Sequence, residues 1–241
     1  MITTILFDMD GTLLPMDTDT FTKGYFSLLC KKMAPYGFKP DELVSGVWAG
    51  TKAMVKNDGS VTNREAFLTA FADIFGEMAE GKEDVFNDFY ANEFDAAVSF
   101  CAPDPDIAPI VRQIAGQGFR VAVATNPIFP RMAVLKRLRW AGFTPDEFAC
   151  ITAYEDSHFC KPNPAYYLEV AERLGVSPSE CLMVGNDLIE DSAALKAGMS
   201  FFFLDTCPLH TENADPSAFP HGSFRDLAAH ITAIRAQQTQ K

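Results

Sequence analysis

The predicted fold is organised around the stretch ITTILFDMDGTLL, residues 2–14. Its apolar run from Ile2 to Phe7 contains two threonines and leads to Asp-Gly, a pattern typical of a buried strand. Asp8 and Asp10 stand two residues apart at the end of that strand, so their side chains point the same way. Open α/β sheets bind ligands at this end, and two carboxylates held so close need a cation or a proton between them. The stretch therefore predicts a metal ion, an acid–base pair, or both.

The same Asp-x-Asp-Gly pattern also occurs in calcium-binding EF-hand loops and in ordinary turns. An EF-hand needs a glutamate at loop position 12, but counting from Asp8 that position is Asp19, and no helix is predicted to lead into the loop. A strand followed by a plain Asp-Gly turn stays open on these residues alone. Other segments of the sequence are needed to distinguish a plain turn from a functional site.

The composition is that of an ordinary globular protein. The chain has 241 residues, 48% hydrophobic and 22% charged, enough to bury a full core. Its net charge of −12 argues against nucleic acid or an anionic membrane as a partner, so an anionic substrate must be held by a local metal, lysine or helix N-terminus. Six scattered cysteines without C-x-x-C spacing indicate free thiols in a reducing compartment. Without a signal-peptide pattern or a membrane-spanning apolar run, we expect a cytoplasmic protein.

The chain divides into two patterns of predicted elements. Residues 15–101 show apolar residues at helical spacing and no strand signal. Strands and helices alternate from Asp104-Pro105, which is expected to start a helix as N-cap and first helical residue. In the first part, helices are predicted at Lys39–Gly50, after the capping box Thr62-x-x-Glu65, and at Lys82–Phe100. In the second part, strands are predicted at Phe119–Ala124, Phe148–Thr152, Cys181–Val184 and Met199–Leu204, and helices at Pro130–Ala141, Asn163–Gly175, Leu188–Ala197 and Leu227–Ile234.

Alternating strands and helices predict a parallel sheet with right-handed crossovers. The expected fold class is α/β: a Rossmann-like parallel-sheet core formed by residues 1–14 and 102–241, with an α-helical cap domain inserted at residues 15–101. An insertion directly after the first strand is placed to cover the end of that strand as a lid. From position alone, Asp17–Thr20 and Trp48–Lys52 are expected on the side of the cap that faces a substrate.

Polar residues follow the strand ends or the loops near them. Each has an ordinary structural explanation: Thr125 as a cap between strand and helix, Lys161 as a surface lysine, Asp187 as an N-cap, and Asp191 as a solvated acid. The functional signal is that the ends of parallel strands lie on one edge of a sheet, so that all these side chains converge. The converging residues are Asp8, Asp10, Thr125, Asn126, Lys161, Asp187 and Asp191.

The segments that carry these residues are FDMDGTLL, VAVATN, KPNP and VGNDLIED, and they resemble, in order, the four motifs of the haloacid dehalogenase (HAD) superfamily. The resemblance covers the whole core and implies a HAD-like phosphohydrolase of the phosphatase-like branch with a helical (C1-type) cap. It implies that Asp8 is the nucleophile that forms an aspartyl-phosphate, and that Asp10 exchanges a proton with the leaving group and with water. It also implies that Mg²⁺ is bound by Asp8, the carbonyl oxygen of Asp10, and Asp187.

The same resemblance implies roles for the remaining residues. The Thr125 hydroxyl and the Asn126 amide are expected to bind phosphoryl oxygens, and Lys161 to steady the phosphate and the charge of Asp8. Asp191 is expected to bind Lys161 or a metal-bound water.

The fourth motif departs from the Gly-Asp that many relatives carry, because this chain has Gly185-Asn186-Asp187. We place Asp187 on the metal and Asn186 beside the metal ligands. A register shifted by one residue would put Asn186 on the metal and weaken the binding of Mg²⁺.

The expected function is Mg²⁺-dependent hydrolysis of a small phosphorylated metabolite by a monomer or weak homodimer. A phosphomutase of the same fold and a non-catalytic binding module are the alternatives. Asp10 favours phosphoryl chemistry over dehalogenation, because a halide leaves without a proton, and none of the expected acids is missing, which favours an enzyme over a binding module. The basic run Lys136, Arg137 and Arg139 is expected to be a solvated helix face.

Overall fold

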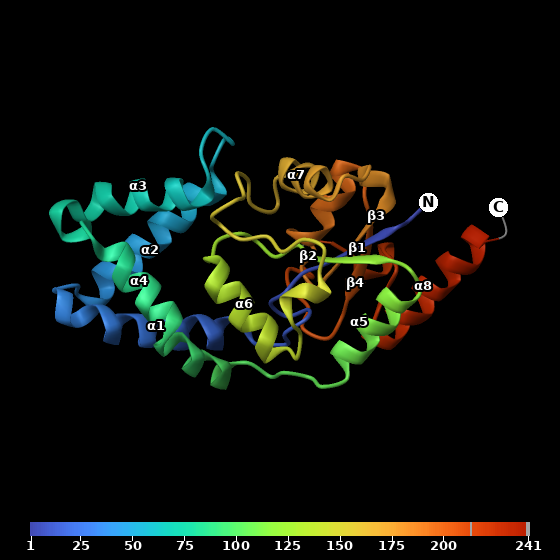
Figure 1. Ribbon diagram of the computed structural model, residues 1–241, viewed down its shortest axis with the longest axis horizontal. Helices are drawn as coiled ribbons and strands as arrows, with labels where there is room; N and C mark the ends of the chain where they lie inside the picture. The colour runs from blue at the N-terminus through green and yellow to red at the C-terminus, as the bar shows by residue number, and fades with distance from the viewer. Residues whose placement is uncertain (213, 240–241) are drawn as a thin grey trace.

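A parallel sheet organises the computed structural model, which describes residues 1–212 and 214–239. The strand order within this described part is β2-β1-β3-β4-β5, and neighbouring strands pair in parallel (Figure 1). The strands are β1 (Thr4–Phe7), β2 (Arg120–Val123), β3 (Cys181–Gly185), β4 (Ser200–Leu204) and β5 (His221–Gly222). In this order the chain adds β2 on one side of β1 and β3 on the other, so the topological switch point lies between β1 and β3. Ligands of open α/β sheets bind at such a point.

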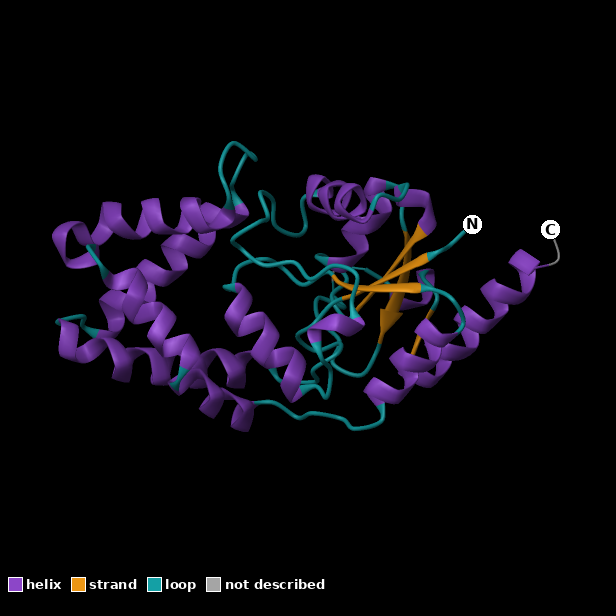
Figure 2. Ribbon diagram, viewed as in Figure 1, coloured by secondary structure: helices purple, strands orange, loops and turns teal. Residues whose placement is uncertain are grey.

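Helices cover both faces of the sheet, as the α/β class requires (Figure 2). Ile5 and Phe7 of β1 belong to one buried cluster with residues of α5 and α8, whereas Leu6 packs with α7 on the opposite face. This division follows from the alternation of side chains along a strand. The core helices are α5 (Ile107–Gly116), α6 (Arg131–Trp140), α7 (Pro164–Leu174) and α8 (Phe224–Thr239).

Four α-helices lie between β1 and residue 101, to one side of the sheet, where Figure 2 draws only helices and loops. We call them the cap helices: α1 (Thr18–Met33), α2 (Pro40–Val55), α3 (Asn63–Phe75) and α4 (Lys82–Ala91). The predicted capping box opens α3: the Glu65 N–H donates to the Thr62 hydroxyl at 3.2 Å, and the Thr62 N–H donates to the Glu65 carboxylate at 2.8 Å. Short 3₁₀ segments lie at Ala34–Tyr36, Gly76–Ala79, Glu93–Phe100, Pro145–Glu147, Pro178–Glu180, Asp191–Ala197 and Pro216–Ala218.

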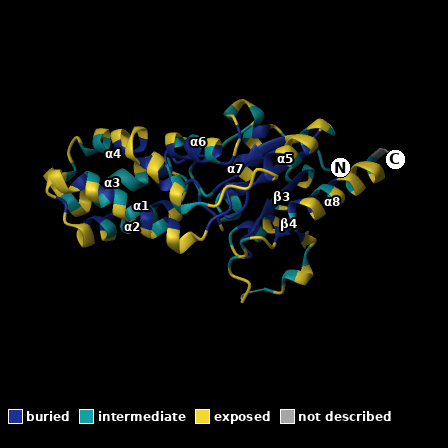
Figure 3. Ribbon diagram, turned by 90° about the horizontal axis from the view of Figure 1, so that it is seen from below, coloured by how far each residue is buried: buried dark blue, intermediate teal, exposed yellow. Residues whose placement is uncertain are grey.

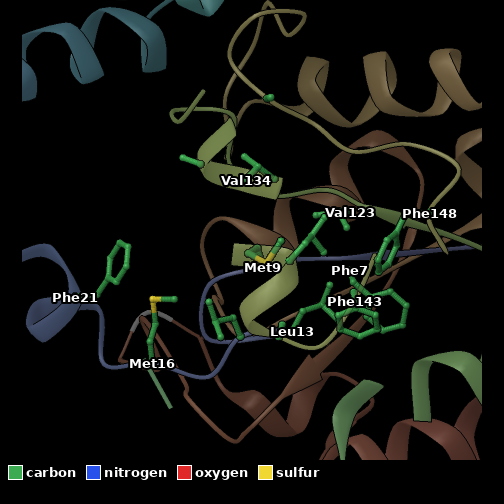
Figure 4. Close-up of a cluster of buried hydrophobic side chains, with 14 of the residues drawn as sticks. Phe7, Met9, Leu13, Met16, Phe21, Val123, Val134, Phe143 and Phe148 are labelled. Carbon is green, nitrogen blue, oxygen red and sulfur yellow. The ribbon is translucent and has the colours of Figure 1, made fainter. Parts of the chain in front are cut away.

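One buried apolar cluster joins the sheet to the cap helices. Figure 4 follows it from Phe7 on β1 through Met9, Leu13 and Met16 to Phe21 on α1. In Figure 3 many exposed residues lie on the cap helices, along α8 and on the loop that follows β4, whereas buried residues fill the region of the sheet. The two parts of the molecule therefore share apolar packing as well as two chain connections.

Hydrogen bonds also hold the cap helices and the segments that connect them to the core. The two connecting segments pair with each other, because Met16 and Cys101 form an antiparallel bridge. At the start of α3, the buried Asn63 side chain donates to the carbonyl oxygens of Pro127 at 3.3 Å and Phe159 at 3.2 Å. The second contact ties the cap helices to the loops after β2, beside the expected site.

Three predicted elements are wrong in detail. Residues 148–152 run beside β2 and exchange backbone hydrogen bonds with it, such as that from the Ala149 N–H to the Val121 carbonyl at 2.9 Å, but they form a single bridge, between Ile151 and Val123, rather than a strand. The helix expected over residues 82–100 breaks at Asn92, whose side-chain amide donates to the carbonyl and carboxylate of Asp88, and continues as 3₁₀. The segment expected to be helical over residues 188–197 is a turn followed by 3₁₀ from residue 191.

Two further differences concern local hydrogen bonding and length. Helix α5 begins at Ile107 rather than at Asp104-Pro105, because the Asp104 carboxylate accepts the Asp106 N–H at 2.9 Å and forms a turn ahead of the helix. Strand β5 has two residues, too few to show an alternating pattern in the sequence. Among the described residues, no helix combines the length and the apolar character needed to span a membrane.

Candidate active site

A cavity of about 310 Å³ lies where the carboxyl ends of the strands meet the cap helices. Seven of the eight predicted site residues contribute to its lining: Asp8, Asp10, Thr125, Asn126, Asn186, Asp187 and Asp191. The eighth, Lys161, lies directly behind Asp8 with a fully buried side chain. The convergence that the sequence predicted is therefore present at one edge of the sheet.

Lys161 joins two carboxylates into a buried chain. Its ammonium group donates to Asp8 Oδ1 at 2.7 Å and to Asp191 Oδ1 at 2.6 Å. The loop that presents Lys161 is held by Asn126, whose side-chain oxygen accepts the Lys161 N–H at 3.2 Å, and α7 begins directly afterwards with Asn163 as its N-cap. Asp191 thus binds the lysine, which was one of its two expected roles.

The electrostatics of this chain follow from burial. Burial raises the pKa of Asp8 to about 7; Lys161 opposes the rise, and the Asp191 and Asp10 carboxylates add to it. Burial also disfavours the charged form of Lys161, but Asp191 and Asp8 outweigh it and raise the pKa of the lysine well above its ordinary value. The lysine therefore stays protonated, and Asp8 carries a charge that a nearby cation would stabilise further.

Two glycines allow the loops of the site to approach each other. Gly185 at the end of β3 leaves room for Asp191, since a Cβ there would lie 2.0 Å from Asp191 Oδ2. That oxygen accepts the Asp187 N–H at 3.0 Å. Gly11 has φ +81°, and a Cβ there would lie 2.3 Å from the Asn186 amide nitrogen. Both loops close on the end of β1 only because these positions carry no side chain.

Asn186 and Asp187 have different surroundings. The Asn186 side chain accepts a hydrogen bond from the Thr12 hydroxyl at 2.9 Å and donates to the Cys207 carbonyl at 2.6 Å, so it ties three loops together. The Asp187 carboxylate accepts the N–H groups of Ile189 and Glu190 at 2.7 and 2.9 Å, and both of its oxygens lie 2.9 Å from His210 Nδ1. The Asp187 carboxylate thus closes the turn after β3 rather than capping a helix, since the 3₁₀ segment begins only at Asp191, and it also lines the cavity.

Thr125 and Asn126 follow β2 as predicted. The Thr125 carbonyl accepts hydrogen bonds from the hydroxyls of Thr152 and Tyr166, both at 2.8 Å, which fixes the end of the strand. The Asn126 side-chain amide donates to both carboxylate oxygens of Glu190 at 3.0 and 3.1 Å. This amide is therefore engaged by the protein itself, so the phosphate-binding role expected for it requires a change of partner.

The largest error of the sequence prediction concerns Arg137. Its side chain is fully buried, its guanidinium forms an ion pair with Asp10 and stacks 4.4 Å from the Phe129 ring centroid, and its Nε donates to the Ala133 carbonyl. Lys136 is also buried, donating to the Ala91 carbonyl and pairing with Asp95, so of the basic run on α6 Arg139 alone is exposed as expected. The sequence does indicate the burial of Arg137, because this residue lies four residues after Ala133 and therefore on the apolar face of the helix.

Two other residues of the cavity were not predicted. Glu190 lies three residues after Asp187, so its spacing could have revealed it; burial raises its pKa to about 8. His210 belongs to the loop after β4 and has φ +55°, which is uncommon outside glycine. A bridge between Leu209 and Asp187 places it beside the acid. No feature of the sequence predicts this contact between the loop after β3 and the loop after β4.

The cavity lining is rich in carboxyl groups: Asp8, Asp10, Asp187, Glu190 and Asp191. Lys161 and Arg137 are the permanent cations paired with them. Within the described residues, no three His, Cys, Asp or Glu side chains are already gathered as a metal site. The expected Mg²⁺ ligands are fewer, two carboxylates and one carbonyl oxygen, and Mg²⁺ commonly uses one or two carboxylates with water completing its shell. The oxygen donors and the excess of carboxylates therefore fit this ion.

The cap helices supply the opposite wall. As expected from position, Thr18, Trp48 and Thr51 contribute to the lining. Most of the other cap residues there are apolar or aromatic, among them Phe21, Phe26, Phe67 and Phe86.

Comparison with known proteins identifies relatives across most of the chain. The family model described as hydrolase, haloacid dehalogenase-like hydrolase, matches residues 2–198. The glyceraldehyde 3-phosphate phosphatase of Methanopyrus kandleri is 27% identical over 201 residues, 83% of this chain and 82% of the relative. The phosphoglycolate phosphatase of Psychrobacter arcticus is 26% identical over 197 residues, 81% of this chain and 80% of the relative.

A solved structure shares the fold. The 2-haloacid dehalogenase of Pseudomonas syringae superposes with a TM-score of 0.60 at 21% identity, covering 97% of this chain and 99% of that one. At this identity the likeness concerns the fold alone. Which chemistry the fold carries depends on the residues at the sheet edge.

Proposed function

Since the chain belongs to the haloacid dehalogenase-like hydrolase family and is a phosphatase of that family, we propose that it hydrolyses a small phosphorylated metabolite with Mg²⁺ through an aspartyl-phosphate at Asp8. The observation that carries the proposal is the buried Asp8–Lys161–Asp191 chain at the switch point of the sheet, with Asp10 two residues after Asp8. A dehalogenase would need no acid at the position of Asp10, since a halide leaves without a proton.

Mg²⁺ is proposed to bind Asp8, the carbonyl oxygen of Asp10, and Asp187. Bound there, the ion would neutralise carboxylate charge and polarise the phosphoryl oxygens. Burial has already raised the pKa of Asp8, so this carboxylate gains from a second cation besides Lys161. The Asn186 side chain is held by Thr12 and Cys207, which supports Asp187 rather than Asn186 as the residue on the metal.

In the first step, Asp8 attacks phosphorus. Lys161 binds Asp8 Oδ1 at 2.7 Å, so we assign the attack to the other oxygen of the carboxylate. The bond from this oxygen to phosphorus forms as the bond from phosphorus to the ester oxygen breaks, and Asp10 gives its proton to the departing alkoxide. Arg137 holds Asp10 Oδ2, and Oδ1, which has no hydrogen-bond partner among the described residues, is the oxygen proposed to carry the proton.

In the second step, water attacks phosphorus and frees Asp8. The bond from water oxygen to phosphorus forms, the bond from phosphorus to Asp8 breaks, and Asp10 accepts the proton of the water. Arg137 holds Asp10 Oδ2 and so orients the carboxylate for this proton transfer. Lys161 keeps its positive charge in both steps and stabilises negative charge near Asp8. Thr125 and Asn126 are proposed to bind phosphoryl oxygens, and Asn126 would first have to leave Glu190.

We also propose that residues 15–101 act as a cap domain over the core formed by residues 1–14 and 102–241. The paired connections at Met16 and Cys101 bring both ends of the insertion together, which is the arrangement of a hinge. The contacts of Asn63 with Pro127 and Phe159 would then hold the cap in the closed position. Closure would exclude water during the first step.

The proposal is tested by phosphate release from p-nitrophenyl phosphate and a panel of small phosphate monoesters, with Mg²⁺ and with EDTA. We expect turnover with Mg²⁺ that EDTA abolishes. Turnover that is equally fast in EDTA would contradict the proposed requirement for Mg²⁺. Binding of an ester without any release would indicate a binding module.

A further inference from the structure

The cap side of the cavity is a wall of aromatic rings. Phe26 packs on Trp48 with ring centroids 5.6 Å apart, and Phe67 meets Phe86 edge to face at 6.3 Å. Tyr25 lies edge to face against Phe129 at 5.5 Å. All six of these residues line the cavity. The leaving group of a substrate whose phosphate lies at Asp8 would be surrounded by this wall.

A second anionic group would find no free cation in the described part of the cavity lining, since the His210 ring already contacts the Asp187 carboxylate. Among the described residues, no lysine or arginine contributes to its lining, and the one charged cap residue there is Glu83. Lys161 and Arg137 are fully buried and already paired with Asp8, Asp191 and Asp10. A carboxylate or second phosphate on the leaving group would therefore lose its hydration without gaining a partner.

Apart from the Glu83 carboxylate, the polar side chains of the wall carry no charge. Tyr25 and Tyr90 hydrogen-bond each other through their hydroxyls at 2.8 Å, and both rings are buried. Burial raises the pKa of Tyr25 to about 12 and that of Tyr90 well above its usual value, so both stay uncharged. The threonines of the lining, Thr18, Thr22 and Thr51, add only hydroxyl groups.

We propose that the physiological substrate is a phosphate monoester whose alcohol part is uncharged and largely apolar, of aryl or branched alkyl type, and carries neither a carboxylate nor a second phosphate. This inference rests on the proposed phosphatase function, because it assigns the leaving group of that reaction. It separates the chain from the Psychrobacter arcticus relative, whose name states phosphoglycolate as its substrate.

A matched pair of esters tests the proposal. Isobutyl phosphate has two methyl groups where phosphoglycolate has two carboxylate oxygens, so the pair differs in charge at nearly constant shape. In the presence of Mg²⁺ we expect kcat/KM for isobutyl phosphate to exceed that for phosphoglycolate by more than about tenfold. An equal or higher kcat/KM for phosphoglycolate would overturn the proposal.

A pair of variants tests whether charge is the cause. Thr22 is half-buried on α1 and lines the cavity. Thr22→Lys introduces a cation, and Thr22→Met adds a side chain of similar length without charge. We expect Thr22→Lys to move the ratio of the two kcat/KM values toward phosphoglycolate by about tenfold relative to Thr22→Met. An equal shift in both variants would assign the selection to shape and overturn the role of charge.

The failure of this inference can be told apart from the failure of the proposed function. If neither ester is hydrolysed, the phosphatase function fails, and the binding of each ester with Mg²⁺ is measured by calorimetry. Tighter binding of isobutyl phosphate would still support an apolar, uncharged ligand. Equal or tighter binding of phosphoglycolate, or no detectable binding of isobutyl phosphate, would overturn it.

Discussion

Two unlike regions enclose the cavity, the strand ends of the sheet and the inner faces of the cap helices. At the sheet edge, Lys161 joins Asp8 and Asp191 by hydrogen bonds of 2.7 and 2.6 Å, and every group is charged or strongly polar. On the cap side, rings such as those of Phe26 and Trp48 pack against each other. Buried charges hold their partners in one geometry, whereas apolar surfaces select by shape and by the absence of charge. We therefore propose that the sheet edge performs the chemistry and that the cap selects the substrate.

The largest expected effect belongs to the sheet edge. Asp8→Asn removes the nucleophile and should lower kcat/KM by at least about 10⁴-fold. Burial raises the pKa of Asp8, so its charged form costs stability above its ordinary pKa, and the neutral variant should melt at the same or a higher temperature than the metal-free wild type at pH 8. The exposed Asp104→Asn, which keeps its turn, is the control. Retained activity in Asp8→Asn would end the assignment of chemistry to this edge.

The next effect concerns Arg137, which orients Asp10 from α6. Arg137→Met should lower kcat/KM by about 10²-fold for alkyl phosphates, which need a proton from Asp10, and much less for p-nitrophenyl phosphate, whose leaving group needs none. Arg139→Met on the exposed side of the same helix should change neither rate. An equal loss on both esters would show that Arg137 only supports the fold.

A smaller effect is expected on the cap side. Trp48 is 50% exposed and lines the cavity, so Trp48→Ala should raise KM by about tenfold for an apolar ester while changing kcat little. Tyr36→Ala removes a similarly exposed ring, 45% accessible, away from the cavity and should leave KM unchanged. A drop in kcat with unchanged KM in Trp48→Ala would show that a cap residue contributes to the chemical step, which would contradict the division of roles between sheet edge and cap.

The smallest effect on activity is expected where the two regions touch. Asn63→Ala removes the hydrogen bonds to Pro127 and Phe159 and leaves their buried carbonyl oxygens without this donor. The free energy of unfolding should fall by about 2 kcal/mol, measured by denaturant titration, with only a few-fold rise in KM. Unchanged stability would show that these two hydrogen bonds do not stabilise the closed cap.

The residues at the sheet edge were more predictable from the sequence than the contacts on the cap side. Asp8, Lys161 and Asp187 could be located because parallel strands end at one edge, so residues far apart in sequence converge by topology alone. The parallel sheet and the capping box of α3 followed from periodicity and local hydrogen bonding for the same reason.

The contacts that escaped prediction are decided by tertiary packing. The charged neighbours of Arg137 in the sequence predict a solvated side chain, whereas packing buries it on the apolar face of α6, where it pairs with Asp10. His210 reaches Asp187 only because the loop after β4 bridges to the loop after β3. On the cap, many aromatic residues recur at helical spacing, and only packing decides that Trp48 lines the cavity whereas Tyr36 does not.

In the proposed mechanism Asp8 becomes phosphorylated during each turnover. The most direct measurement is mass spectrometry of enzyme quenched in mild acid, where acyl phosphates survive, within milliseconds of mixing with excess ester, followed by peptide mapping. We expect one added phosphoryl group on the peptide that contains Asp8, absent from the Asp8→Asn variant. Hydrolysis of the ester with no such adduct, or with the phosphoryl group on another residue, would contradict it.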